Sequence, residues 1–276
     1  MKYTTLLFDL DETLFDFLKS EEYAACKLME VYGIPATKDN YELYSAINAE
    51  KWLMLEKGEI TRPKLLVERF ADFFGRVGAK ADPVEVNKVY MKLLSQAGFM
   101  LDGALDTCRI LSEKYSLYLV TNGTKYVQTG RLSNSPITEY IKGVFISEDI
   151  GYNKPQKEYF DYVLAHIEEK DKSKILVIGD SLSSDIAGAV NSGLDCCWVN
   201  RKKQAVKSPA TFEIGEVTEF YVDEDNNSRY NVIYQKAPTG KVIRHNPTKY
   251  LIDYIEGQGV TLPEGFINPA YDIKED

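Results

Sequence analysis

Two aspartates stand two residues apart near the start of the chain, directly after a short apolar run. The run covers residues 5–8 and is typical of a buried strand, and the two carboxylates are Asp9 and Asp11. In α/β proteins, ligands bind outside the carboxyl ends of the strands. A carboxylate there can attack phosphorus and form an aspartyl-phosphate, and a second one can transfer the proton. The spacing indicates phosphoryl-transfer chemistry, with a solvated acidic turn as the alternative.

Polar and charged residues also follow three later apolar runs. The runs cover residues 117–121, 144–146 and 175–178, and the side chains that end or follow them are Thr121, Asn122, Lys154, Asp180 and Asp185. A hydroxyl and an amide suit the oxygens of a phosphoryl group, and a lysine adds positive charge. Each motif alone also occurs as an ordinary turn, helix cap or surface residue. Four of them at four strand ends indicate one shared site.

The carboxylates in this set predict a metal ion. Asp9 and Asp180 would meet at one edge of the sheet, where two like charges repel strongly without a cation. Oxygen ligands favour Mg²⁺, which binds through one or two carboxylates together with water and substrate phosphate. The ion neutralises the nucleophile and the phosphate, Lys154 adds a second positive charge, and Asp11 protonates the leaving alcohol. Such positioning and charge stabilisation are sufficient for phosphoryl transfer.

The elements that must position these residues alternate between strand and helix along much of the chain. A fifth apolar run covers residues 196–199, and amphipathic helical stretches cover residues 102–115, 155–168 and 183–192. This alternation predicts an α/β fold with a parallel sheet and helices on its faces. Right-handed crossovers then place the carboxyl ends of all the strands at one edge.

Residues 16–98 depart from this alternation because their pattern is helical almost throughout. Four amphipathic stretches cover residues 21–32, 41–56, 63–77 and 83–97, and glycines punctuate them at positions suited to helix ends. A helical block placed directly after the first strand predicts a small second domain. Its aromatic residues are expected to form its core; they include Trp52, Phe70, Phe73 and Phe74.

Residues 218–276 form a C-terminal extension with a different pattern. Residues 230–234 and 241–244 predict two strands around a turn, and residues 247–256 predict a helix. The acidic turn at 223–228 partly matches a calcium loop, but it lacks the required glycine and has Tyr234 in place of the final glutamate. A solvated turn is therefore the better interpretation. The extension itself could serve as a stabilising appendage, a dimer contact or a lid.

Composition disfavours several other classes of protein. The 276 residues carry a net charge of −9, from 42 acidic and 33 basic side chains, which argues against nucleic-acid binding. No apolar run approaches the ~20 residues that span a bilayer, and acidic residues interrupt the apolar N-terminal stretch. Four cysteines without a C-x-x-C pair and two histidines argue against a zinc site. We expect a soluble cytoplasmic monomer or homodimer without a nucleic-acid or membrane partner.

The motifs together resemble those of the haloacid dehalogenase superfamily over residues 1–217. The matching residues are Asp9 to Thr13, Thr121 with Asn122, Lys154 with Pro155, and Gly179 with Asp180 and Asp185. The resemblance implies an α/β fold with a Rossmann-like core, residues 1–15 and 99–217, and a helical cap over residues 16–98. It also implies a Mg²⁺-dependent phosphomonoester hydrolase that forms an aspartyl-phosphate.

The resemblance also implies a role for each matching residue. By this resemblance, Asp9 is the nucleophile and Asp11 is the general acid/base. Thr121 and Asn122 bind the transferring phosphoryl group, and Lys154 stabilises its charge. Mg²⁺ is held by Asp9, the Asp11 backbone carbonyl and Asp180, and Asp185 supports that site. The second aspartate, Asp11, argues against a dehalogenase, which needs no metal. A non-catalytic binding protein is a remote alternative, because all seven groups are present.

A finer resemblance is to the bacterial pyrimidine 5′-nucleotidases. It rests on residues 11–15, 59–62, 121–123, 146–151 and 194–200. It implies hydrolysis of nucleoside monophosphates such as UMP, dUMP or dTMP. Because substrate choice in this superfamily lies in the cap, a phosphosugar phosphatase and a phosphoglucomutase-like phosphotransferase stay open as alternatives.

Overall fold

The computed structural model describes residues 2–222 and 230–232 of the chain. The chain divides into two compact units, residues 1–218 and residues 219–276. Within the described residues, no helix combines the length and the apolar character needed to cross a bilayer.

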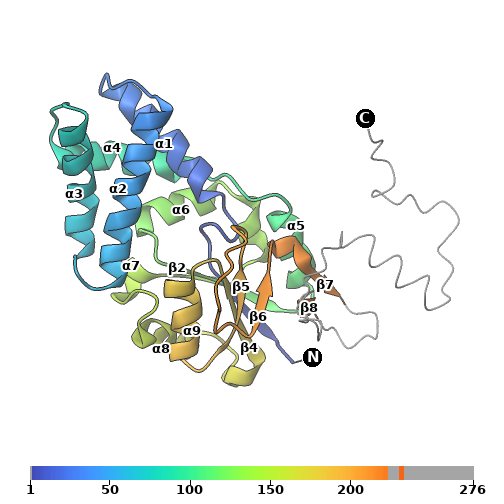
Figure 1. Cartoon of the computed structure of the whole chain (residues 1–276). Coiled ribbons are helices and arrows are strands. Elements are labelled where there is room, and N and C mark those ends of the chain that lie inside the picture. The colour runs from blue at the N-terminus through green and yellow to red at the C-terminus, as the bar shows by residue number, and fades with distance from the viewer. Residues whose placement is uncertain (1, 223–229, 233–276) are drawn as a thin grey trace, which may run out of the picture. The chain divides into compact units, whose positions relative to one another are not determined.

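The unit 1–218 is built on a six-stranded parallel sheet in the order β3-β2-β1-β4-β5-β6 (Figure 1). The strands are β1 (Thr5–Phe8), β2 (Ser116–Thr121), β3 (Gly143–Ile146), β4 (Ile175–Gly179), β5 (Asp195–Val199) and β6 (Phe212–Ile214). Phe8 of β1 pairs with Leu119 of β2 and with Ile178 of β4, so the carboxyl ends of these three strands meet at one edge. The predicted α/β fold with a parallel sheet is confirmed.

Helices cover the sheet between successive strands. They are α5 (Ala104–Ser112), α6 (Lys125–Ser133), α7 (Ser147–Ile150), α8 (Lys157–His166) and α9 (Ala187–Asn191), with shorter turns η1 (Pro136–Tyr140), η2 (Lys172–Lys174) and η3 (Leu182–Ile186). A further short turn, η4 (Val217–Glu219), follows β6. On one face of the sheet, Phe160 of α8 and Ala189 of α9 belong to the same buried cluster as Leu7 and Val177. Strands covered in this way read as continuous apolar runs, which is why the sequence reveals them.

Two elements of this unit lie outside the predicted pattern. β6 has three residues, with exposed Glu213 between Phe212 and Ile214, and so short a strand carries no periodicity. α6 has nine residues, and its buried side chains include the polar Gln128 and Arg131. Its apolar face is narrow for that reason, and the helix has no clear amphipathic signal.

Four helices occupy the chain between β1 and β2 and form a helical insert (Figure 1). They are α1 (Phe17–Val31), α2 (Lys38–Glu56), α3 (Arg62–Arg76) and α4 (Pro83–Gln96). Phe70 and Phe73 are fully buried, and Tyr44 stacks on Phe70 with ring centroids 5.5 Å apart, so aromatic rings fill the core of the insert as predicted. The prediction that Trp52 belongs to this core is wrong. Trp52 is half-buried and lines a cavity shared with the sheet.

The chain enters and leaves the helical insert at one place. The backbone N–H of Asp16 donates to the carbonyl of Phe99 at 3.0 Å, and that of Leu101 donates to Leu14 at 2.9 Å. The two crossings therefore run antiparallel and are bonded to each other. Asp16 also begins α1, because its carboxylate accepts a hydrogen bond from the N–H of Lys19 at 2.9 Å.

The unit 219–276 contains one described strand pair. β7 (Phe220–Val222) pairs antiparallel with β8 (Tyr230–Val232). The strand predicted at 230–234 is found over its described residues, 230–232, but its described partner is β7 rather than residues 241–244. Residues 241–244, the predicted helix at 247–256 and the acidic turn at 223–228 lie outside the described residues.

Candidate active site

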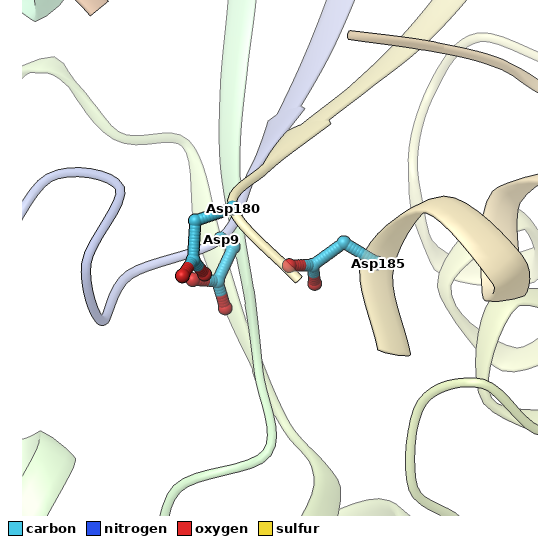
Figure 2. A group of neighbouring side chains, drawn as sticks. All are labelled: Asp9, Asp180 and Asp185. Carbon is cyan, nitrogen blue, oxygen red and sulfur yellow. The ribbon is translucent and has the colours of Figure 1, made fainter. Parts of the chain in front are cut away.

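Three carboxylates gather at the carboxyl edge of the sheet (Figure 2). Asp9 follows β1, Asp180 follows β4, and Asp185 lies in η3, a single π-helical turn of a kind frequent at functional sites. Each offers an oxygen within 4.8 Å of the others. Oxygen donors so closely spaced are the ligand set of a hard divalent cation, so the residues present fit the predicted Mg²⁺.

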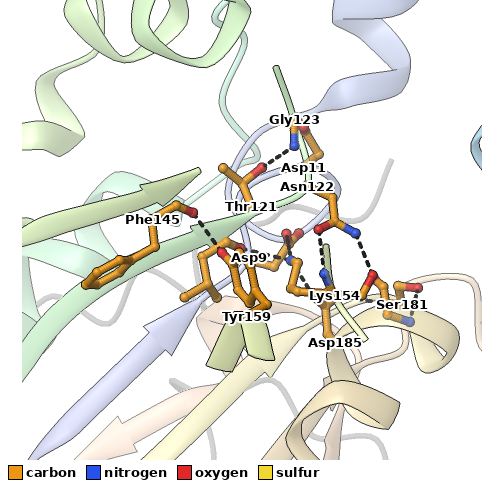
Figure 3. Close-up of polar contacts among 12 residues, drawn as sticks. Asp9, Asp11, Thr121, Asn122, Gly123, Phe145, Lys154, Tyr159, Ser181 and Asp185 are labelled. Atoms are coloured by element: carbon orange, nitrogen blue, oxygen red, sulfur yellow. Dashed lines mark hydrogen bonds and ion pairs between the residues drawn. The ribbon is translucent and has the colours of Figure 1, made fainter. Parts of the chain in front are cut away.

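Lys154 lies between Asp9 and Asp185 and is 1% exposed (Figure 3). Its Nζ donates to Asp9 Oδ1 at 2.6 Å, to Asp185 Oδ1 at 2.6 Å and to the carbonyl of Val120 at 2.9 Å. An ammonium group has three donors, so each of them is used. The lysine is therefore held in one position between the first and fourth strand ends.

Burial and like charge shift the protonation of this cluster. Burial raises the pKa of Asp9 to about 7, although Lys154 opposes the shift. Burial, together with Asp9 and Asp185, raises the pKa of Asp180 well above its usual range. Burial alone would lower the pKa of Lys154, but Asp185 and Asp9 raise it. If all three carboxylates were ionised beside one ammonium group, an excess of negative charge would remain, which a divalent cation would balance.

Asp185 is fixed by Lys154 and by the turn that follows β4. Its Oδ1 accepts from Lys154 and its Oδ2 from the backbone N–H of Ser181 at 3.1 Å. Gly179 makes room for it, because a Cβ at that position would overlap the Asp185 carboxylate. The indole N–H of Trp198 on β5 donates to the carbonyl of Asp180 at 2.8 Å and holds the same turn from the other side.

The side chain of Asn122 is committed to Lys154. Asn122 Oδ1 accepts from the backbone N–H of Lys154 at 2.8 Å, and Nδ2 donates to its carbonyl at 2.9 Å (Figure 3). The Asn122 side-chain amide thus bonds to both the N–H and the carbonyl of a residue 32 positions away, in the way that one strand bonds to its neighbour. The predicted phosphoryl contact at Asn122 stays a prediction, and the side-chain amide already serves another purpose.

Thr121 and Asp11 are brought together by two residues that motif reasoning missed. Thr121 Oγ1 accepts from the N–H of Gly123 at 3.1 Å and from Gln128 Nε2 at 3.0 Å. Gln128 Nε2 also donates to Asp11 Oδ2 at 2.8 Å, and Arg131 donates to Asp11 Oδ1 at 2.5 Å. The available signal was a glutamine and an arginine three residues apart, which share one face of a helix beginning just after the motif turn.

The helical insert reaches the site through Arg62, the first residue of α3. One guanidinium nitrogen donates to the carbonyls of Asn122 and Gly123 at 3.0 and 2.9 Å. The other donates to Ser147 Oγ at 2.6 Å and Asn153 Oδ1 at 2.5 Å. These partners follow β2 and β3, so one side chain of the insert joins two strand ends.

A cavity of about 210 Å³ lies between the insert and the strand ends. The sheet contributes polar and charged groups to its lining, and the insert contributes a mostly apolar wall. The sheet side includes Asp9, Asp11, Thr121, Lys154 and Asp180, and the insert side includes Phe17, Trp52, Glu56, Leu66, Arg69 and Met91. The predicted site residues therefore meet in one cavity, and a ligand there would contact both parts of the unit.

Comparisons with known proteins agree with this geometry. A family model described as haloacid dehalogenase-like hydrolase matches residues 3–193. The HAD-hydrolase YfnB of Bacillus subtilis is 38% identical over 80% of this chain and 94% of its own length. The pyrimidine 5′-nucleotidase PynA of Streptococcus pneumoniae is 37% identical over 72% of this chain and 85% of its own, and YjjG of Escherichia coli, also a pyrimidine 5′-nucleotidase, is 31% identical over 72% and 87%.

The fold comparison leads to the same family. The crystal structure of Bacillus subtilis YfnB bound to magnesium, which reveals interdomain movement in that protein, superposes with a TM-score of 0.76 over 80% of this chain and 98% of that chain. The family match covers the strands that carry all four motifs. The chain is therefore a hydrolase that belongs to the haloacid dehalogenase-like family.

Proposed function

We propose that this protein is a Mg²⁺-dependent phosphomonoesterase in which Asp9 becomes transiently phosphorylated. The observation that carries the proposal is the placement of Asp9, whose Oδ1 is held by Lys154 at 2.6 Å while its carboxylate faces the cavity beside Asp180. Lys154 holds the carboxylate in place, and its positive charge lies where a phosphoryl group would approach.

The metal ion would be held by the carboxylates of Asp9 and Asp180 and by the backbone carbonyl of Asp11. Bound there, Mg²⁺ would supply positive charge to the phosphoryl oxygens and to the nucleophile. Asp185 supports this arrangement through Lys154 and the N–H of Ser181. The magnesium in the structure of the relative YfnB supports this proposal.

The chain's own residues account for both half-reactions. Asp9 attacks phosphorus, the bond from phosphorus to the leaving oxygen breaks, and Asp11 gives that oxygen a proton. In the second half, Asp11 takes a proton from water, the water oxygen attacks phosphorus, and the bond to Asp9 breaks, which releases phosphate. The Thr121 hydroxyl, which already accepts two hydrogen bonds, retains its own O–H to donate to the phosphoryl group. At Asn122, we assign the phosphoryl contact to the backbone of the turn.

The substrate we propose is a pyrimidine nucleoside 5′-monophosphate. The nucleotidase relatives PynA and YjjG support this choice. The insert side of the cavity offers Trp52, an aromatic ring on which a base can stack, with the Arg62 guanidinium 5.8 Å from its centroid. We assign residues 16–98 to a cap that selects the substrate, and residues 218–276 to an appendage.

The test is phosphate release in Mg²⁺ from a panel of nucleoside monophosphates and sugar phosphates, with Asp9→Asn protein as the blank. We expect turnover of UMP, dUMP or dTMP and at least a ~10⁴-fold lower rate for the variant, because an amide is a poor nucleophile toward phosphorus. Turnover of sugar phosphates alone would keep the chemistry and reject the nucleotidase assignment. An active Asp9→Asn protein would show that another group is the nucleophile.

A further inference from the structure

Both oxygens of the Asp11 carboxylate are held by one helix of the core. Arg131 donates to Oδ1 at 2.5 Å and Gln128 donates to Oδ2 at 2.8 Å, and both side chains come from α6. We propose that Gln128 and Arg131 are positioning residues, which hold Asp11 beside the Thr121 hydroxyl so that it transfers a proton to the leaving oxygen. This inference rests on the proposed phosphatase function.

Gln128 has only one orientation that satisfies its neighbours. A carboxylate only accepts and a guanidinium only donates, so Nε2 faces Asp11 while Oε1 accepts from Arg131 at 3.1 Å. The same Nε2 donates to Thr121 Oγ1 at 3.0 Å, which ties the acid/base to the phosphoryl-binding hydroxyl. Gly123 leaves the necessary space, because a Cβ there would overlap the Gln128 amide.

Arg131 is held as firmly as the carboxylate that it binds. Its side chain is fully buried, and its guanidinium lies 4.8 Å from the centroid of the Phe15 ring. A second nitrogen is 3.5 Å from Ser20 Oγ. Removing the partner of a buried ion pair is strongly destabilising, and in the described part of the chain Asp11 is the carboxylate that pairs with this guanidinium. Arg131 therefore has no competing acidic partner among these residues.

The Asp11 carboxylate keeps lone pairs free to bind the proton that it must transfer. Each carboxylate oxygen has two lone-pair sites, and the hydrogen bonds from Arg131 and Gln128 take one site on Oδ1 and one on Oδ2. Asp11 also lines the cavity, and its side chain is 28% exposed. The two clamping residues thus fix the direction of the carboxylate without closing its access to substrate.

Helix α6 is itself seated against the helical insert. Gly130 lies so close to α4 that an added Cβ would come within 2.7 Å of the Ser95 Cβ and 2.9 Å of its carbonyl oxygen. Val127, one residue before Gln128, is buried in the hydrophobic cluster of the insert. The direction of Asp11 therefore depends on how the insert packs on α6.

A comparison of two phosphate esters separates a loss of proton transfer to the leaving group from a general loss of activity. The kcat/KM value covers every step up to departure of the leaving group. The 5′-oxygen of the deoxyribose in dUMP must receive a proton as it leaves, whereas p-nitrophenolate leaves without one. Loss of Asp11 positioning should therefore slow dUMP far more than p-nitrophenyl phosphate.

We would measure kcat/KM for both esters in Arg131→Met and Gln128→Leu, with Arg109→Met as the matched control, because Arg109 is exposed and pairs only with Asp106 among described residues. We expect about a 100-fold loss or more on dUMP and less than about a tenfold loss on p-nitrophenyl phosphate. Arg131→Lys should recover part of the dUMP activity. Thermal melting would confirm folding, and Gln128→Leu keeps the test valid if Arg131→Met does not fold.

Equal losses of kcat/KM on both esters would overturn the positioning role. A gain of kcat/KM on dUMP would also overturn it, because it would mean that α6 holds Asp11 away from its working position. A wild-type protein that hydrolyses neither of these esters, and no nucleoside monophosphate or sugar phosphate of the panel, would refute the phosphatase function and this inference with it. If the wild type hydrolyses a sugar phosphate but not dUMP, that sugar phosphate takes the place of dUMP in the comparison. An active wild type with equally slowed variants would refute the inference alone.

Discussion

Arg62 donates to the backbone carbonyl of Gly123 at 2.9 Å, so the first residue of α3 in the insert is bonded to the turn that follows β2. Burial lowers the pKa of the Arg62 guanidinium. Its four hydrogen bonds all go to neutral oxygens in the core. A partly buried cation without a paired carboxylate among the described residues therefore lies beside the proposed phosphoryl-binding turn.

Replacing Arg62 should weaken the seating of the insert over the site. We expect Arg62→Met to raise KM for a nucleoside monophosphate by about tenfold or more and to lower kcat as well, because each hydrogen bond to a charged group makes a net contribution of roughly 1.5–3 kcal/mol. Lys64→Met on the same helix is the control, since Lys64 is exposed. Steady-state kinetics that match those of the wild type would show that the Arg62 contacts are incidental.

Trp52 should contribute to recognition of the base rather than of the phosphate. Trp52→Leu is expected to raise KM for dUMP by about 3- to 10-fold, which corresponds to the roughly 0.5–1.5 kcal/mol of an aromatic contact. Ribose 5-phosphate, which lacks a base, should change by less than about twofold. Leu53→Ala serves as the control because Leu53 is 45% exposed. Equal effects on both substrates would count against stacking.

Metal binding should stabilise the protein more at high pH than at low pH. Burial raises the pKa of Asp9 to about 7 and that of Asp180 well above its usual range. A raised pKa in the folded state means that Asp9 contributes stability fully below about pH 4 and loses it as pH rises through about 7. The contribution of Asp180 is lost in the same direction, as pH rises through its own raised pKa. Mg²⁺ binds the ionised carboxylates, so its stabilising effect grows over the same interval.

The measurement is the Tm in Mg²⁺ minus the Tm in EDTA, at pH 6 and at pH 8. We expect the larger difference at pH 8 and a reduced difference at both values in Asp180→Asn. The same difference at both pH values would argue that Mg²⁺ binds elsewhere.

Gly179 should tolerate no side chain, since a Cβ would overlap the Asp185 carboxylate. Gly179→Ala is expected to cost about 1–3 kcal/mol of unfolding free energy and to lower kcat, because Asp185 would lose its place against Lys154. Gly75→Ala is the matched control: Gly75 lies inside α3 with open space around it, and alanine should stabilise that helix by up to ~1 kcal/mol. Urea unfolding measures the free energy of unfolding of both variants, which should fall in Gly179→Ala and rise in Gly75→Ala. An unchanged free energy of unfolding in Gly179→Ala would contradict the close packing.

The sheet and its carboxylates were predictable for a simple reason. Asp9 and Asp180 each follow an apolar run that is buried on both faces, and parallel strands bring such positions to one edge. Because each aspartate directly follows its strand in the sequence, the two side chains are expected to lie close together in the fold. Lys154 is predictable in the same way as a charge near a strand end, although the sequence says nothing of its three partners.

The positioning groups were much harder to predict. Gln128 and Arg131 lie on a helix, where polar residues more often face water than a buried carboxylate. The pairing of Asn122 with the backbone of Lys154 joins residues 32 positions apart, which local spacing does not encode. Trp52 was mistaken for core because large aromatic residues are usually buried, whereas its place on the cavity depends on how the insert meets the sheet.

The paired crossings at Asp16–Phe99 and Leu14–Leu101 mean that the chain between them begins and ends at the same point in space. A segment whose ends already meet can be lengthened, shortened or exchanged as a cassette without stretching the strands on either side. The proposed catalytic residues at the strand ends and the cavity wall that the insert contributes can therefore evolve separately. For protein engineering, grafting the equivalent segment of a relative between these two crossings would transplant the wall while leaving Asp9, Asp180 and Asp185 in place, and a graft that keeps the packing on α6 would also keep the direction of Asp11.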